Sequence, residues 1–236
     1  YFASISSKYQ WSYFIRFIIQ GYIDLILSAL FQLIFLSTKS LNIFLNSALA
    51  VAALSISFAF PVYCFFFILK HHFKFNKEAY KLFRDKWGSL YDEFNNDRGA
   101  FSSMFYIVFL LRRLIYVTIL FALEDYPSIQ VCLNVIHSLM SVIYVGVSRP
   151  FKEKLITFST FYCEVCISIT FGLCGFYLMD LSENTRVVLQ WIVLGVVYSA
   201  IGVNFIVSTI LSIRKLKEAY SMWRERYLAR LKSVRL

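Results

Sequence analysis

Long apolar runs, separated by short polar or charged segments, form the main pattern along this chain of 236 residues. A helix needs about 20 predominantly apolar residues to cross the hydrocarbon core of a bilayer. Six stretches qualify, namely 12–37, 45–69, 102–123, 127–148, 155–179 and 185–213. They lack the period-two alternation and the short turns of a membrane β-barrel. The pattern therefore predicts an all-α, polytopic membrane protein with six transmembrane helices.

The composition supports the same class of protein. Hydrophobic residues make up 59% of the chain and charged residues only 16%, whereas soluble domains carry about 25% charged residues. We expect a six-span transmembrane domain over 1–213 and a basic cytoplasmic helix over 214–236. Because Tyr1 is not an initiator Met and no signal-peptide pattern follows, we expect a fragment of a longer protein. Pro61 should kink the second helix, because proline lacks a backbone donor.

The distribution of Lys and Arg predicts the orientation in the membrane. Basic residues gather in the loop 70–101, in the loop 149–154 and in the tail after Ser212, which share one side of a six-span topology. The other side has only Lys39 and Arg186. The excess of positive charge on cytoplasmic loops places both termini and the long loop in the cytoplasm. We interpret the net charge of +10 as a topology signal and an attraction to anionic lipid, not to nucleic acid.

Five ionisable residues fall inside the predicted spans, at depths of about 14–18 Å from a span end at 1.5 Å per residue. They are Asp24, Arg112, Arg113, His137 and Glu164. A charge at the bilayer centre costs at least about 2.5–3.5 kcal/mol, so such groups usually face a bundle interior or a watery cavity. Adjacent helical positions point about 100° apart, so the two arginines need different partners. We expect one of them to pair with Glu164 or Asp24.

This charge layer has three interpretations. It is a charge clasp that fixes helix packing, or an element that responds to ions or voltage. In the third, one arginine extends to the headgroups because the predicted third span has the wrong boundaries.

Other reactive side chains favour structural roles. Cys163 and Cys166 have CxxC spacing, but no second pair accompanies them in an apolar helix, so we interpret them as packing residues. For His137, a hydrogen-bonded histidine is favoured over a proton relay. No hydrolytic, phosphate-binding or dinucleotide-binding motif occurs. We therefore expect no enzyme activity, no metal and no cofactor.

Two basic segments carry aromatic residues at helical spacing. Segment 77–94 predicts an amphipathic interfacial helix broken near Gly88, or a soluble helix packed beneath the domain. The tail 214–236 suits anionic lipid or a calmodulin-like partner, and a solvated extension is the alternative. The basic residues expected to face lipid in the tail are Arg214, Lys215, Lys217, Arg224 and Arg226.

Several short motifs occur in a characteristic order. Lys86-Trp-Gly-Ser-Leu-Tyr-Asp-Glu-Phe94 precedes Leu111-Arg-Arg-Leu114, and Pro127-Ser-Ile-Gln130, Asn134, Tyr144 and Arg149-Pro-Phe151 follow. This order resembles the membrane region of the TRP-like proteins of fungi and protists, which include polycystin-like and flavin-carrier-type proteins. Ciliate surface proteins with Cys-rich ectodomains share it. The resemblance covers residues 86–151 and is weaker in the flanking spans.

The resemblance implies a membrane domain that forms a calcium-permeable channel, often below an extracellular domain. This chain departs from that pattern between its last two predicted spans. The connection Asp180–Thr185 is too short to fold a pore helix and a carbonyl-lined filter. Any conduction must therefore use another route.

Three functional hypotheses follow. The chain is a TRP-like ion channel or mechanosensitive transport domain, a non-conducting anchor of a large extracellular or ciliary assembly, or an accessory subunit of a larger membrane complex. We expect an integral protein of the plasma or ciliary membrane, in contact with anionic lipids and in a homo-oligomer or larger complex. A continuous polar cavity favours the first hypothesis, and a dry, fully paired charge layer the second. Extensive apolar contact with other chains favours the third.

Overall fold

The computed structural model describes residues 2–34, 41–72, 94 and 100–234. Its helices are α1 (Phe2–Ile34), α2 (Leu41–His72), α4 (Ala100–Ser103), α5 (Phe105–Ala122), α6 (Pro127–Ser148), α7 (Lys154–Phe176) and α8 (Glu183–Val234). The described residues contain no strand, only an isolated bridge between Phe94 and Phe151. The predicted all-α class is therefore correct for this part of the chain. The predicted interfacial helix 77–94, apart from Phe94, lies outside the described residues.

Five segments among the described residues are long and apolar enough to cross a membrane. They are Asn42–Phe66, Phe105–Ala122, Pro127–Ser148, Lys154–Phe176 and Glu183–Glu225. The predicted first span belongs to α1, whose described apolar part, Gly21–Ile34, is shorter than a full crossing. These five segments are therefore consistent with an integral membrane protein. A sixth span is not established by the described residues.

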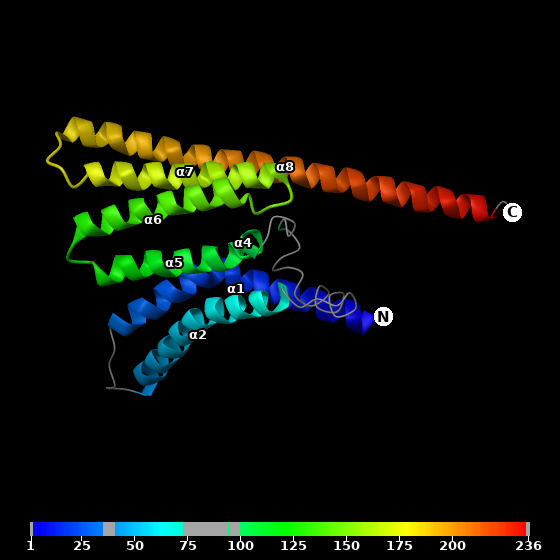
Figure 1. Ribbon diagram of the computed structural model, residues 1–236, viewed down its shortest axis with the longest axis horizontal. Coiled ribbons are helices and arrows are strands. Elements are labelled where there is room, and N and C mark those ends of the chain that lie inside the picture. Colours follow the sequence, from blue (N-terminus) through cyan, green and yellow to red (C-terminus); the bar gives the residue numbers. More distant parts are fainter. Residues whose placement is uncertain (1, 35–40, 73–93, 95–99, 235–236) are drawn as a thin grey trace.

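The helices form two groups that lie side by side (Figure 1). One group contains α1, α2 and α5, with α1 packed along α2 and α5 against both. The other contains α6, α7 and α8, in which α7 lies between α6 and α8. Contact between α5 and α6, which joins the groups, is much sparser than contact within the second group. The bundle therefore has a thin seam between α5 and α6.

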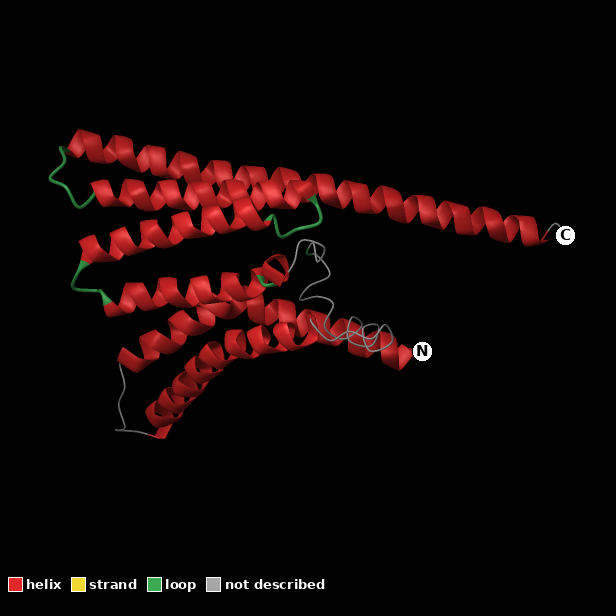
Figure 2. Cartoon of the chain, in the orientation of Figure 1, coloured by secondary structure: helices red, strands yellow, loops and turns green. Residues whose placement is uncertain are grey.

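The connections divide between the two ends of the bundle (Figure 2). The turn 123–126 and the link 177–182 lie at one end, and the loop 149–153 lies at the other. The C-terminal part of α8 extends far beyond this second end (Figure 1). As a single helix of 52 residues, α8 is roughly 78 Å long at 1.5 Å per residue. The predicted last span and the predicted basic tail thus form one continuous helix.

Phe94 anchors the entrance to α5. Its side chain is fully buried, and its ring packs on Tyr106 at 4.9 Å, Phe151 at 5.4 Å and Phe105 at 5.6 Å between ring centroids. The Ser102 hydroxyl donates a hydrogen bond to the Pro150 carbonyl at 3.0 Å. These contacts hold the start of α5 against the α6–α7 loop, at the end of the bundle where the seam would otherwise open.

Pro61 lies inside α2, which is visibly curved in Figure 1. Proline has no N–H, so it leaves the carbonyl four residues earlier, that of Ser57, without its helical partner. The Tyr22 hydroxyl on α1 donates a hydrogen bond to this carbonyl at 2.6 Å. All three residues are buried. A backbone acceptor released by proline in one helix is thus satisfied by a side chain from its neighbour, which ties α1 to α2.

We expect Tyr22→Phe to lower the free energy of unfolding by about 1–3 kcal/mol, because it leaves the buried Ser57 carbonyl without a donor. The same change made in a Pro61→Ala background should cost much less relative to that background, since an alanine at position 61 supplies a backbone N–H to the same carbonyl. Unfolding in mixed detergent micelles measures both. Tyr198→Phe, at a position 63% exposed, is the control and should have little effect.

Candidate functional site: an intramembrane cleft

The ionisable residues predicted to share one depth come from four helices. Arg112 and Arg113 lie near the middle of α5, Glu164 near the middle of α7 and His137 near the middle of α6. Asp24 lies on α1 and is exposed. The first four line one cleft, which opens along the seam between the two helix groups.

Arg112 forms an ion pair with Glu164. The pair joins α5 to α7, across the seam between the two helix groups. The side chains of Arg112 and Glu164 are only 16% and 8% exposed. An unpaired charge at this depth would be costly, and in the pair each group neutralises the other. The expected pairing of an arginine with Glu164 is confirmed.

Arg113 points away from Arg112, toward α1 in the helix group of α5 itself, as the angle between neighbouring helical positions allows. Its guanidinium donates a hydrogen bond to the Ile19 carbonyl on α1 at 3.0 Å. The same group lies over the Phe109 ring at 4.1 Å, a cation–π contact. Asp24 is close enough for its charge to act on Arg113. The two adjacent arginines thus connect α5 to α7 on one side and to α1 on the other.

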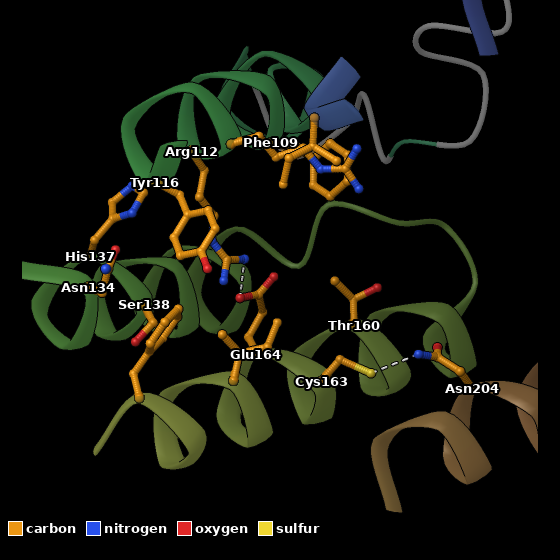
Figure 3. Close-up of a pocket in the computed structure, with 14 residues that line it drawn as sticks. Phe109, Arg112, Tyr116, Asn134, His137, Ser138, Thr160, Cys163, Glu164 and Asn204 are labelled. Atoms are coloured by element: carbon orange, nitrogen blue, oxygen red, sulfur yellow. Dashed lines mark hydrogen bonds and ion pairs between the residues drawn. The ribbon is translucent and has the colours of Figure 1, made fainter. Parts of the chain in front are cut away.

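The cleft has a volume of about 430 Å³. Figure 3 shows Arg112 reaching from α5 to Glu164, with Tyr116 beside it and His137 and Asn134 on α6. Its polar lining consists of Arg112, Arg113, Tyr116, Asn134, His137, Ser138, Thr160, Cys163, Glu164 and Asn204. Five helices contribute to the wall, since Ile23 of α1 and Asn204 of α8 complete it.

Asn134 gives the cleft its main chemical signature. Its side chain is only 3% exposed, yet its Oδ1 has no hydrogen-bond partner among the described residues. A buried amide oxygen without a partner is costly, especially inside a membrane. Water needs a polar cavity with several partners, and 430 Å³ has room for on the order of ten molecules. The geometry and the polar lining therefore suit a hydrated cleft.

Asn204 joins α8 to α7 at the edge of the cleft. Its Nδ2 donates a hydrogen bond to the Cys163 thiol at 2.9 Å, and its Oδ1 accepts one from the Ser159 hydroxyl at 2.6 Å. Hydrogen bonds of this kind hold membrane helices together. Cys163 and Cys166 are free cysteines. Within the described residues, no group of three or more His, Cys, Asp or Glu side chains is arranged to hold a metal ion.

The basic residues of the predicted tail lie far from the cleft, on the part of α8 that projects from the bundle. Arg214, Lys215, Lys217 and Arg224 are exposed there. The Arg226 side chain lies outside the described part of the chain. Whether these residues face lipid therefore stays a prediction.

Sequence analysis missed the neutral polar residues of the site. Asn134 entered only as part of a family-like motif, and Asn204, Ser138 and Ser168 were not singled out. The Ser168 hydroxyl donates to the Ser138 hydroxyl at 3.0 Å, which links α7 to α6 below the cleft. Asn134 and Asn204 could have been identified because each is an asparagine inside an apolar span, where the side-chain amide needs partners that lipid does not supply.

Comparisons with protein-family models, with curated proteins and with solved structures find no match to this chain. Functional inference therefore rests on the geometry of the cleft.

A double-mutant cycle tests the ion pair. Arg112→Gln and Glu164→Gln should each lower the free energy of unfolding by about 3–5 kcal/mol, because each leaves a buried charge without its partner. The double variant should lose clearly less than the sum of the two. Detergent unfolding measures the cycle, with the exposed Arg186→Gln as the control for loss of a single positive charge. Additive losses would contradict a direct ion pair.

Proposed function

We propose that this chain is a membrane transport domain, an ion channel or mechanosensitive transport domain of the TRP-like kind. The observation that carries the proposal is the polar cleft at mid-depth between two weakly joined helix groups. Ion and substrate pathways through membranes are commonly marked by ionisable side chains that face a wet cavity. The motif order over 86–151 adds a family resemblance. Since no catalytic motif accompanies the cleft, we propose transport and not an enzymatic reaction.

The cleft is also the best available route for ions across the membrane. The link between α7 and α8 spans only residues 177–182 and is folded into tight backbone turns, such as that from the Leu178 N–H to the Gly175 carbonyl at 3.2 Å. A carbonyl-lined filter has no room there. Permeation would therefore pass Arg112, Glu164 and Asn134, where charged and amide groups can replace part of the hydration shell of an ion.

The thin seam supplies a way to open this route. Small sliding or rotation of one packed helix group against another is a common form of conformational change in proteins. Here the Arg112–Glu164 ion pair bridges the seam at mid-depth, and the aromatic contacts of Phe94 bridge it at one end. A stimulus such as membrane tension or voltage would act on the ion pair, because separating it would widen the cleft.

A second candidate is a non-conducting anchor of a large extracellular or ciliary assembly. The ion pair itself favours this alternative, because it neutralises Arg112 and Glu164 and locks the two helix groups together. An anchor needs rigid packing and no hydrated route. The unsatisfied Asn134 amide and the volume of the cleft fit transport better. The role of accessory subunit in a larger complex remains a further alternative.

For the orientation, we propose six spans in the plasma or ciliary membrane, with both termini on its cytoplasmic side. The basic loop 149–154 lies at the same end of the bundle as the basic extension of α8 (Figure 1). The helix α8 begins at the other end, with Arg186 in its first turn. This separation agrees with the excess of positive charge on cytoplasmic segments. Anionic lipid and a homo-oligomer or larger membrane complex are the proposed partners.

Cysteine labelling tests the orientation. In a variant without native cysteines, Lys152→Cys should react with a membrane-impermeant reagent only from the cytoplasmic side, and Glu183→Cys only from the opposite side. The alternation of α6, α7 and α8 between the two ends requires this difference. Labelling of both positions from the same side would refute the topology.

Flux measurements test transport. The purified chain in liposomes should pass calcium or monovalent cations under a potential or under membrane tension. Arg112→Ala or Glu164→Ala should change the flux or its voltage dependence, and Asn134→Leu should strongly reduce it, because an apolar side chain dewets a narrow passage. The matched control is Cys132→Leu, an exposed position on the same helix. Well-inserted protein without flux under either stimulus would favour the anchor.

A further inference from the structure

A second cavity, of about 460 Å³, lies where α6 ends and α7 begins. It is separate from the cleft and shares no lining residue with it. Its wall combines the basic residues Arg149, Lys152 and Lys154 with the aromatic residues Phe158 and Phe161. Positive and aromatic side chains thus meet in one hollow of the surface.

The position of this cavity along the helices sets its depth in a bilayer. The candidate span Pro127–Ser148 ends immediately before Arg149, and the candidate span Lys154–Phe176 begins at Lys154. The basic side chains therefore lie at the boundary of the hydrocarbon layer, at the level of lipid headgroups. Phe158 follows about one turn and Phe161 about two turns further into the span.

The charges around the cavity favour an anion. Arg149, Lys152 and Lys154 are exposed, and the one carboxylate among residues 149–154 is that of Glu153, also exposed. Residues 149–154 by themselves therefore carry a net charge of two positive units. The positive end of the α7 dipole and the negative end of the α6 dipole both lie here, so the basic side chains carry the attraction for an anion. Arginine and lysine at this level attract the phosphate groups of anionic lipids.

The apolar part of the cavity fits a hydrocarbon chain. Phe158 is 57% exposed and Phe161 is 37% exposed, so both present ring surface outward along the span. Phe158 also stacks on Tyr162, with 6.2 Å between ring centroids. A lipid whose headgroup contacts the basic rim could lay an acyl chain along these rings. A free phosphate ion would make no favourable contact with this apolar wall.

The backbone at Arg149 supplies an independent indication. Arg149 ends α6 in the left-handed conformation, with φ of 40°, where glycine is the favoured residue. A bulky side chain there is strained, and strained residues often occur at ligand contacts. Arg149 in this conformation lines the cavity.

We propose that this cavity binds the headgroup of an anionic phospholipid, with its phosphate at Arg149, Lys152 and Lys154 and an acyl chain along Phe158 and Phe161. The proposal is independent of whether the protein conducts ions. It assigns a lipid site to the α6–α7 junction, away from the basic extension of α8.

Native mass spectrometry of the purified chain in detergent tests this site, with phosphatidylserine, phosphatidylcholine and inorganic phosphate as probes. The wild type should bind phosphatidylserine in preference to phosphatidylcholine. Lys152→Gln/Lys154→Gln should weaken phosphatidylserine binding roughly 25-fold, from about fivefold for each cation near the surface. The control Arg186→Gln removes one charge near the start of α8, at the other end of the bundle, and should leave binding nearly unchanged. Lys152→Gln alone, its matched single variant, should weaken binding about fivefold.

Arg149→Gly separates binding from folding. It should weaken phosphatidylserine binding about fivefold while the melting temperature in detergent stays equal or rises, because glycine relieves the left-handed backbone. This variant decides the matter if the double lysine variant fails to fold. The proposal is wrong if the control Arg186→Gln loses as much affinity as Lys152→Gln, if phosphatidylcholine binds equally well, or if inorganic phosphate displaces phosphatidylserine at comparable concentration.

Discussion

In the hydrocarbon layer of a bilayer, lipid does not complete the hydrogen bonds of a polar group, so such a group needs a partner within the protein or in a hydrated cavity. This constraint explains the main tertiary contacts of the bundle. The Ser57 carbonyl, left without its helical donor by Pro61, accepts a hydrogen bond from the Tyr22 hydroxyl. The Arg113 guanidinium donates one to the Ile19 carbonyl. Arg112 forms an ion pair with Glu164. In each case a polar group that lipid cannot satisfy finds its partner on another helix.

The helix α5 has the central place in this arrangement. Its neighbouring arginines point to different helix groups, and its first turns are held by Phe94 and Phe151. Its faces toward α1 and α2 are filled by apolar side chains, of which Leu110 and Val117 are almost completely buried. The face toward α6 and α7 is not filled in the same way, and there the cleft remains. A rigid contact on one side and a polar gap on the other make α5 the element whose position controls the cleft.

Most of the outer surface is apolar and suits contact with lipid. Only 6% of the most apolar stretch of α8 is buried inside the protein. This helix packs mainly against α7, along one narrow face. Without a hydrophobic drive between helices in lipid, small polar contacts such as that of Asn204 with Cys163 carry more of the specificity. A bundle held in this way can shift between arrangements that differ little in buried apolar area.

The sequence by itself determined the helices, their approximate ends, the apolar spans from α5 to α8 and the separation of basic segments, because hydropathy and helical period are local properties. It also determined that Arg112 and Arg113 need different partners, since the angle between adjacent positions is a property of any helix. The pattern also predicted that the basic tail continues as a helix from the last span, as α8 does. It did not reveal that α1 begins as early as Phe2 or that its described apolar part is short.

Only the tertiary structure decided which carboxylate Arg112 meets. Glu164 and Asp24 were equal candidates by depth, but depth along a helix says nothing about its rotation or its neighbours. The rotation of α7 turns Glu164 toward α5, whereas Asp24 stays exposed on α1. The same applies to Asn134, whose unsatisfied amide exists only because α6 turns it toward a cleft that α5 does not fill. Partner choice depends on packing between helices distant in sequence, and no local pattern encodes it.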